Sequence, residues 1–165
     1  MLREAAENGD LEAVTRLVWY EGSDATLRDR WRCTPLHLAA LNGHEVVCVT
    51  LLDAQGVGVN AKDNDEETPL HWASQMGNAE VMRLLLEKGA DATLKDNKGS
   101  SPLHLAALYG RKVVCVTLLQ THGVEVNAKD NDENTPLHLA SRKGKAELVR
   151  LLLEMGADAT SRNDE

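Results

Sequence analysis

The sequence lacks long apolar stretches and clusters of basic residues. Its apolar runs are only a few residues long, whereas a transmembrane helix needs about 20. We therefore expect neither a membrane span nor a secretory signal. The chain carries 26 acidic and 18 basic residues, a formal net charge of −8. Nucleic acids and anionic membranes attract basic surfaces, so neither is expected as the main partner. A cytoplasmic protein, with a nuclear location as the alternative, fits this composition.

Sequence motifs of catalysis and of ion binding are also missing. The chain has no Gly-x-Ser-x-Gly, no phosphate-binding glycine loop and no His-Glu-x-x-His. The acidic strings 63–67 and 130–134 resemble a calcium loop only faintly, because they lack its central glycine and its terminal glutamate. We expect these strings to form solvated turns. The sequence predicts a protein that is not an enzyme and that uses no cofactor and no metal.

What the sequence does contain is a repeated string. Thr-Pro-Leu-His, once with Ser in the first place, starts at Thr34, Thr68, Ser101 and Thr135, with spacings of 34, 33 and 34 residues. Such a period is typical of a solenoid whose units are each too small to bury their own apolar face. Residues 2–29 lack the string but keep its glycine and apolar spacing. We predict one elongated domain of about five units.

Each string predicts the start of a short helix. The Thr or Ser hydroxyl can cap free N–H groups, and proline suits the first helical position. A glycine ends this helix at 43, 77, 110 and 144, because glycine adopts a positive φ easily. A second, apolar helix follows, and then an Asn/Asp-rich segment such as 60–65 that predicts a turn or a hairpin.

These strings resemble the ankyrin repeat. The four copies read TPLHLAA, TPLHWAS, SPLHLAA and TPLHLAS, and nearly the whole chain follows their register. The resemblance implies an all-α repeat solenoid, in which helix-turn-helix units joined by β-hairpins or loops form an L-shaped, elongated stack. It implies a single domain over residues 1–165, with repeats at about 1–28, 29–62, 63–95, 96–129 and 130–165.

The histidines and cysteines have structural roles in this interpretation. Equivalent atoms in adjacent repeats stand about 10 Å apart, whereas a zinc–nitrogen bond is about 2 Å long. The string histidines therefore cannot share an ion, and we expect each to tie the hairpin to its helix. His44 and His122 are predicted to be isolated. Cys48 and Cys115, two units apart, are predicted to be buried thiols, and Cys33 a free thiol near the surface.

One turn position departs from the family pattern. The family places glycine two residues before the string, but only Gly99 follows this pattern. Arg32, Glu66 and Glu133 stand at the other three positions and would be strained if the turn requires a positive φ. A natural array tolerates such defects. The sequence is also similar to engineered ankyrin scaffolds, so a designed array without a natural partner remains the alternative.

The resemblance also implies where a partner protein binds. In ankyrin proteins the hairpin tips and the inner helices form a concave face that contacts the partner. The matching positions here are Arg30, Trp31, Leu41, Asp65, Glu67, Gln75, Met76, Lys98, Leu108, Tyr109, Arg142 and Lys143, and the same mapping adds Cys33, Asn42, Asn64, Asn97, Ser100, Asn131, Asp132 and Asn134. The large apolar members would form a stripe flanked by basic residues. Alternatively, the two leucines cover neighbouring helices and the stripe is incidental.

The predicted function is that of a monomeric adaptor, inhibitor or recognition arm that binds another protein. A modification site is also implied. Asn127 follows Leu119, Glu125 and Val126, an arrangement similar to the sites at which ankyrin hairpins are hydroxylated on asparagine. Asn60 matches this arrangement less well. The alternative is that each asparagine bonds to its own turn.

Overall fold

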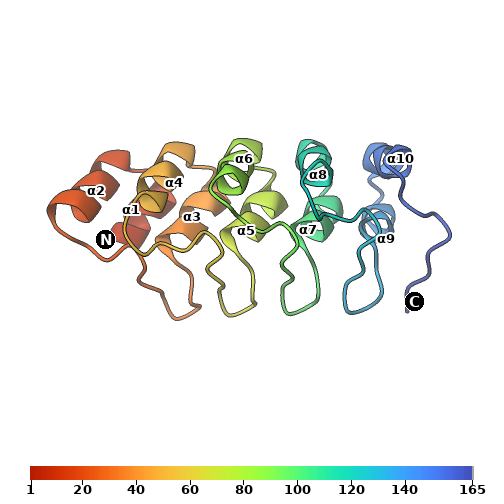
Figure 1. Ribbon diagram of the computed structural model, residues 1–165, viewed down its shortest axis with the longest axis horizontal. Helices are drawn as coiled ribbons and strands as arrows, with labels where there is room; N and C mark the ends of the chain where they lie inside the picture. Colours follow the sequence, from red (N-terminus) through yellow and green to blue (C-terminus); the bar gives the residue numbers. More distant parts are fainter. Residues whose placement is uncertain (165) are drawn as a thin grey trace.

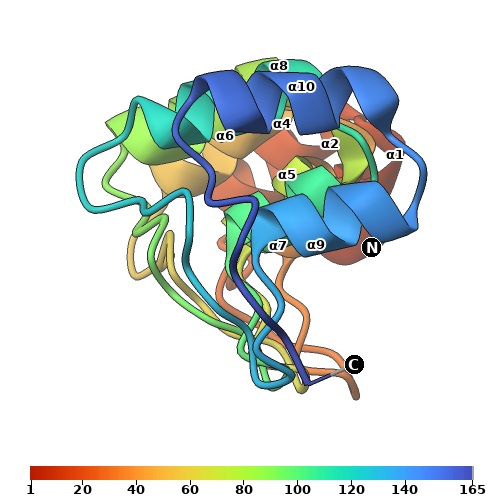
Figure 2. The ribbon, with the colours of Figure 1, turned by 90° about the vertical axis from the view of Figure 1, so that its right-hand side faces the viewer.

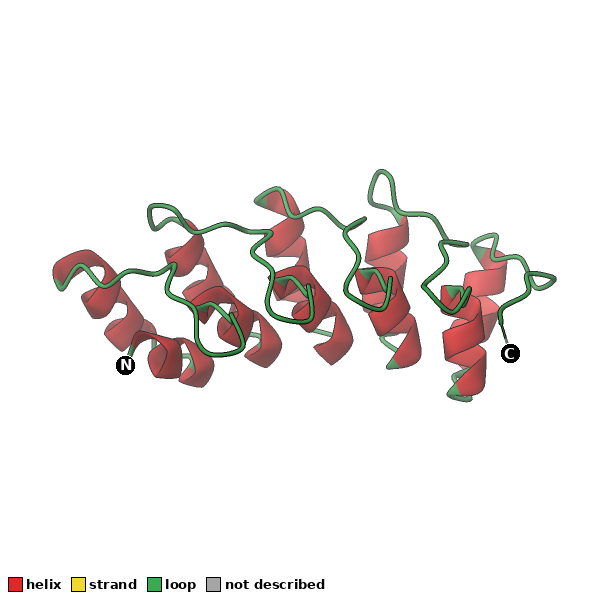
Figure 3. Ribbon diagram, turned by 90° about the horizontal axis from the view of Figure 1, so that it is seen from below, coloured by secondary structure: helices red, strands yellow, loops and turns green. Residues whose placement is uncertain are grey.

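The computed structural model describes residues 1–164, which form pairs of short helices stacked side by side (Figure 1). The elements are α1 (Leu2–Asn8), α2 (Leu11–Thr15), the π-helical turn η1 (Arg16–Tyr20), α3 (Pro35–Asn42), α4 (Glu45–Leu52), α5 (Pro69–Met76), α6 (Ala79–Glu87), α7 (Pro102–Leu108), α8 (Lys112–Leu119), α9 (Pro136–Arg142) and α10 (Ala146–Glu154). Residues 1–164 contain no strand (Figure 3). The connections are thus loops, the second of the two predicted forms.

The helices form two layers. The inner helices α1, α3, α5, α7 and α9 contact one another in sequence order, and α2, α4, α6 and α8 do the same in the outer layer. The long loops leave the helical layers on one side, which gives the stack an L-shaped cross-section (Figure 2). The predicted all-α, L-shaped solenoid is confirmed. The inner helices and the loops meet at an angle, and we call the surface inside this angle the concave face.

Each string starts an inner helix through a reciprocal cap. The Oγ1 of Thr34 lies 2.8 Å from Nδ1 of His37, and the backbone N–H of Thr34 donates to the same ring nitrogen. The other three units repeat this pair of bonds at 2.8 to 3.2 Å. Because Nδ1 accepts both bonds, the ring is neutral and carries its proton on Nε2. The cap therefore determines the tautomer of the histidine.

The other ring nitrogen ties each unit to the next. Nε2 of His37 donates to the backbone oxygen of Glu67 at 3.2 Å. The equivalent bonds join His71 to Ser100, His104 to Asn134 and His138 to Ser161, at 3.2, 3.2 and 3.0 Å. The structural role predicted for these histidines is confirmed. The histidine links two units, however, and not only a loop and a helix of one unit.

The core runs along the stack between the two layers. The residue directly before each string histidine is a leucine, and Leu36, Leu70 and Leu103 are fully buried. Ala39, Ala40, Ala73, Ala106 and Ala140 are also fully buried and allow the inner helices to approach closely. This arrangement agrees with a fold in which burial comes from stacking neighbours.

The three thiols are all free and buried. Cys48 and Cys115 lie in the outer layer, as predicted, and burial raises the pKa of each to about 12. The surface position predicted for Cys33 is wrong, because only 4% of this residue is exposed. Cys33 directly precedes an inner helix and lies close to Asp63 and Glu67 of the next loop. Burial and these carboxylates raise the pKa of its thiol to about 11.

The loop turns adopt a left-handed backbone at the position where the family prefers glycine. Arg32, Glu66 and Glu133 have φ values of 63°, 62° and 59°, and Gly99 has 73° at the same place. A residue with a Cβ atom is strained in this region. Glu66 and Glu133 each offset part of this cost through an ion pair, with Lys62 at 2.7 Å and Lys129 at 2.6 Å.

Replacing Arg32 with glycine should stabilise the protein by about 1 kcal/mol, because glycine adopts this φ without strain. Glu66→Gly and Glu133→Gly should stabilise it less per site, since each also loses an exposed ion pair worth a few tenths of a kcal/mol. Urea unfolding measures all three. A lower midpoint with an unchanged slope for Arg32→Gly would contradict the expected strain.

Candidate binding surface

The loop tips are held in shape by a repeated aspartate. Oδ1 of Asp63 accepts hydrogen bonds from the backbone N–H groups of Asp65 and Glu67, both at 2.9 Å. Asp29, Asp96 and Asp130 do the same in their own turns. Asp63 is only 4% exposed. The solvated turn predicted for its string is therefore wrong at this residue, because the carboxylate is part of the turn itself.

Adjacent tips are joined by backbone hydrogen bonds. The N–H of Asn64 donates to the oxygen of Trp31, that of Asn97 to Asp65 and that of Asn131 to Lys98, each at 2.9 Å. The amide side chains of the same three asparagines donate to the preceding tip as well. The loop side of the concave face is thus one connected row, so its side chains are held in place before a partner arrives.

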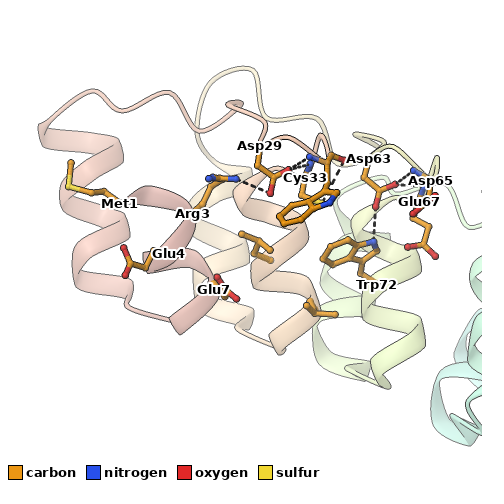
Figure 4. A pocket seen from close by; sticks show the side chains of 13 residues that line it. Met1, Arg3, Glu4, Glu7, Asp29, Cys33, Asp63, Asp65, Glu67 and Trp72 are labelled. Atoms are coloured by element: carbon orange, nitrogen blue, oxygen red, sulfur yellow. Dashed lines mark hydrogen bonds and ion pairs between the residues drawn. The ribbon is translucent and has the colours of Figure 1, made fainter.

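A hollow of about 590 Å³ occupies the N-terminal part of the concave face. It lies between α1, α3, α5 and the tips of the first two loops (Figure 4). Its lining residues are Met1, Arg3, Glu4, Glu7, Asp29, Trp31, Cys33, Leu38, Leu41, Asp63, Asp65, Glu67 and Trp72. Two indole rings and two leucines thus share one hollow with six carboxylates. The space is large enough for several side chains of a partner.

The hollow is strongly acidic. Arg3 is the single basic residue in its lining, and its guanidinium lies 2.8 Å from the carboxylate of Asp29. Burial, together with the nearby carboxylates of Asp63, Asp96 and Asp65, raises the pKa of Glu67 to about 7. Removal from water and like charge both disfavour the ionised carboxylate. A cation placed beside Glu67 would relieve this penalty.

The two tryptophans are held differently. The indole N–H of Trp72 donates to Oδ2 of Asp63 at 3.0 Å, and the ring meets His37 edge to face at 5.5 Å. Trp31 is 55% exposed, and the guanidinium of Arg30 lies 3.8 Å from the centre of its ring. This Arg30 contact shows that the face of Trp31 accepts a guanidinium.

The structure brings only some of the predicted partner-binding residues together. The hollow contains Trp31, Leu41, Asp65 and Glu67, with Arg30 over the indole. Further along the stack Met76, Lys98 and Tyr109 are exposed, whereas Gln75 and Leu108 are half-buried. At the C-terminal end Arg142 lines a second hollow of about 330 Å³ with Leu137, Val149 and Leu153, and Lys143 is exposed.

Three positions of the wider mapping are wrong. Cys33, Ser100 and Asn134 precede their strings directly and are 4%, 6% and 2% exposed. The backbone oxygens of Ser100 and Asn134 accept the histidine bond of the preceding unit, and the Asp96 and Asp130 turns hold the backbone N–H groups. Burial of their side chains therefore removes these three from the contact surface.

The sequence-based mapping missed one of the two indole rings and several of the carboxylates that line the hollow. Trp72, Asp63, Glu4 and Glu7 were not among its residues, although all four line the space. Trp72 carried a signal, since it stands where the other three strings have leucine. The first helix carried a weaker signal. When the alanine pairs 5–6 and 39–40 are aligned, Glu4 and Glu7 occupy the places of Leu38 and Leu41.

His44 is not isolated, contrary to prediction. Its Nε2 lies 2.9 Å from the backbone oxygen of Glu7. Asn78 and Arg111 occupy the same place in later units and bond to backbone oxygens at the end of the preceding inner helix. This position thus caps the helix of the unit before it, which is why a polar side chain occurs there.

The two candidate hydroxylation sites also bridge units. The side-chain oxygen of Asn60 accepts from the N–H of Asp91 at 2.9 Å, and that of Asn127 from Asp158 at 2.8 Å. Their amide groups donate to Gly89 and Gly156 at 3.5 and 3.4 Å. The bonds run to the following unit and not to the asparagine's own turn. Hydroxylation of either residue stays a prediction.

Two further findings concern residues 1–164 alone. No helix in this range is both long and apolar enough to cross a membrane. Within the same range, no three His, Cys, Asp or Glu side chains are grouped so that they could hold a metal ion.

Comparison with known proteins agrees with this architecture. A family model described as "Ankyrin repeats (3 copies)" matches residues 2–96 and 89–163. The chain belongs to the ankyrin-repeat family. Inversin of Danio rerio is 37% identical over 90 residues, which cover 53% of this chain and 8% of the relative. The 26S proteasome non-ATPase regulatory subunit 10 of Dictyostelium discoideum is also 37% identical over 90 residues, which cover 54% of this chain and 39% of the relative.

A third relative is a homologue of transient receptor potential cation channel subfamily A member 1 from Caenorhabditis elegans. It is 37% identical over 89 residues, 54% of this chain and 7% of the relative. The chain thus matches only a minor part of each of these proteins. The similarity extends to their ankyrin-repeat regions, whose general role is to bind other proteins.

Proposed function

We propose that this protein is a non-catalytic module that binds another protein through its concave face and loop tips. Exposed aromatic and apolar side chains on this face carry the proposal. Trp31, Met76 and Tyr109 are 55%, 42% and 44% exposed, and such residues are typical anchors of protein interfaces. They stand on a scaffold whose loops are joined in one row, which limits the entropy lost on binding.

The module acts as a monomeric adaptor, inhibitor or recognition arm, in the cytoplasm or the nucleus. The three free thiols are consistent with a reducing compartment. We further propose one domain over residues 1–165, with repeat boundaries near those predicted from the sequence. Partner capture followed by mass spectrometry distinguishes this function from a designed array without a natural partner. The strained turns at Arg32, Glu66 and Glu133 favour a natural array, because a consensus design would place glycine there.

Truncating one central anchor, Met76→Ala or Tyr109→Ala, or the aromatic anchor Trp31→Ala, should weaken the captured complex about thirtyfold, which corresponds to about 2 kcal/mol. Such a complex should bury on the order of 800 Å² of this protein. Binding is measured by calorimetry, with circular dichroism as the folding control. Val46→Ala and Val113→Ala are matched controls, because these residues are 59% and 60% exposed on the outer helices α4 and α8. Parent-like affinity of all three anchor variants would contradict the assignment of the concave face.

A further inference from the structure

The acidic hollow differs in charge from the rest of the concave face. Its lining has six carboxylates against the one guanidinium of Arg3. Further along, the positions equivalent to Asp65 and Leu41 include Lys98 and Arg142. A low-dielectric hollow lined mainly by one sign of charge raises the local concentration of the opposite sign. The N-terminal hollow is therefore complementary to a cation, whereas the lining of the second hollow holds both the guanidinium of Arg142 and the carboxylate of Asp158.

The first two units differ in how they neutralise the turn aspartate. Arg3 stands two residues before its alanine pair, as His37 does, and it pairs with Asp29 at 2.8 Å. In the next unit the imidazole of His37 is neutral and donates to a backbone oxygen instead. Asp63 has no ion pair among residues 1–164, and its second oxygen accepts only the indole N–H of Trp72. The second unit thus has the turn aspartate, Asp63, but no arginine at the position that Arg3 occupies in the first unit.

Apolar and aromatic surface lies next to this unbalanced charge. Leu38 and Trp72 occupy the same place on α3 and α5, and Leu41 lies one turn beyond Leu38. Figure 4 shows the carboxylates of Asp63, Asp65 and Glu67 beside the Trp72 indole. A flat cation can stack on such a ring while its N–H groups reach the carboxylates.

We propose that the hollow binds an extended segment of the partner protein through one arginine side chain next to an apolar side chain. The guanidinium lies against Trp72 and bonds with Asp65 and Glu67, and the apolar side chain packs on Leu38 and Leu41. Arginine is favoured over lysine because its planar fork stacks on indole and bonds carboxylates at two points. This assignment rests on the proposed function, because it names the partner chemistry for that same face.

Binding of such a segment should release a proton. Glu67 faces the carboxylates of Asp63, Asp65 and Asp96 and the indole of Trp72, and its pKa lies near 7 in the free protein. A guanidinium beside Glu67 lowers this pKa, so the bound state holds fewer protons at neutral pH. Affinity should therefore rise as the pH increases from 6 to 8. Glu67→Gln should remove this pH dependence, whereas a merely structural role for Glu67 would not produce it.

The test uses a library of random twelve-residue peptides displayed on phage and selected on the full chain. We expect enrichment of arginine next to a large apolar residue. One enriched sequence is then synthesised with blocked ends, together with a form in which citrulline, which is uncharged and of the same shape, replaces arginine. The citrulline form should bind at least tenfold more weakly, since a charge-assisted pair is worth roughly 1.5–3 kcal/mol.

Protein variants locate the site. Asp65→Asn with Glu67→Gln should weaken the arginine peptide at least tenfold. Glu12→Gln with Glu80→Gln should leave its affinity within twofold, because both carboxylates are exposed on the outer helices α2 and α6, outside the hollow. Three results would each overturn the proposal. The enriched peptides could lack arginine, the citrulline form could bind as tightly as the arginine form, or the double variant could bind the arginine peptide like the parent. If one of these outcomes occurs but the enriched peptides still lose affinity for the Met76→Ala or the Tyr109→Ala variant, this proposal fails and the proposed function survives. If no concave variant changes binding, both fail.

Discussion

Between pH 7 and pH 4.5, the contribution of His71 to the free energy of unfolding should fall by about 2 kcal/mol. Burial lowers the pKa of His71 from 6.5 to about 4, because its ring lies fully buried in a neutral cap. The unfolded chain binds a proton at about pH 6.5, whereas the folded chain does not until about pH 4. Stability is therefore present above the unfolded pKa and is lost as the pH falls through this window. Burial shifts the pKa of His37 and of His104 in the same direction.

Glu67 opposes this effect. Its pKa is raised in the folded state, to about 7, so it binds its proton before the unfolded chain does and adds stability as the pH falls. Urea unfolding from pH 7 to 4.5 should therefore show a steeper loss for Glu67→Gln than for the parent. His71→Gln should be less stable at pH 7 but lose less stability on acidification. Parallel pH profiles for His71→Gln and the parent would show that His71 does not titrate as expected.

Leu103→Ala should cost about 3 kcal/mol or more, because it opens a cavity in a fully buried site of α7, which packs between α5 and α9. The same change at Leu137 should cost less. Leu137 occupies the equivalent place on α9, is 8% exposed and has an inner helix beside it on one side within residues 1–164.

Urea unfolding of the two variants measures the difference at constant chemistry, since residue type and position in the unit are the same. Leu153→Ala is the control, because Leu153 is 42% exposed, and the change should cost well under 1 kcal/mol. Equal losses at Leu103 and Leu137 would contradict the dependence of burial on stacked neighbours.

The sequence predicted those parts of the fold that depend on short-range chemistry. Helix starts at Pro35, Pro69, Pro102 and Pro136 followed from the hydroxyl and proline of each string. The positive φ at Glu66 followed from the position that glycine usually occupies. Both depend on residues within a few positions of one another, so a single copy of the repeat is enough to infer them.

The hollow could not be predicted in this way. It requires Arg3, Leu38 and Trp72 to meet from three different inner helices, and the burial of Cys33 depends on the following loop. In the first unit the second helix ends in the π-helical turn η1, which leaves Trp19 and Tyr20 exposed. None of these features repeats with the period of the chain, and the period was the source of the sequence-based predictions.

The histidine bond between units also gives the stack a direction. Each imidazole donates toward the C-terminal side, so the four segments that contain Glu67, Ser100, Asn134 and Ser161 are each anchored by the unit that precedes them in the chain. The two faces of one unit are therefore not equivalent: one offers a ring N–H and the other a carbonyl oxygen. Two such arrays could extend each other only head to tail, because like faces would oppose two donors or two acceptors.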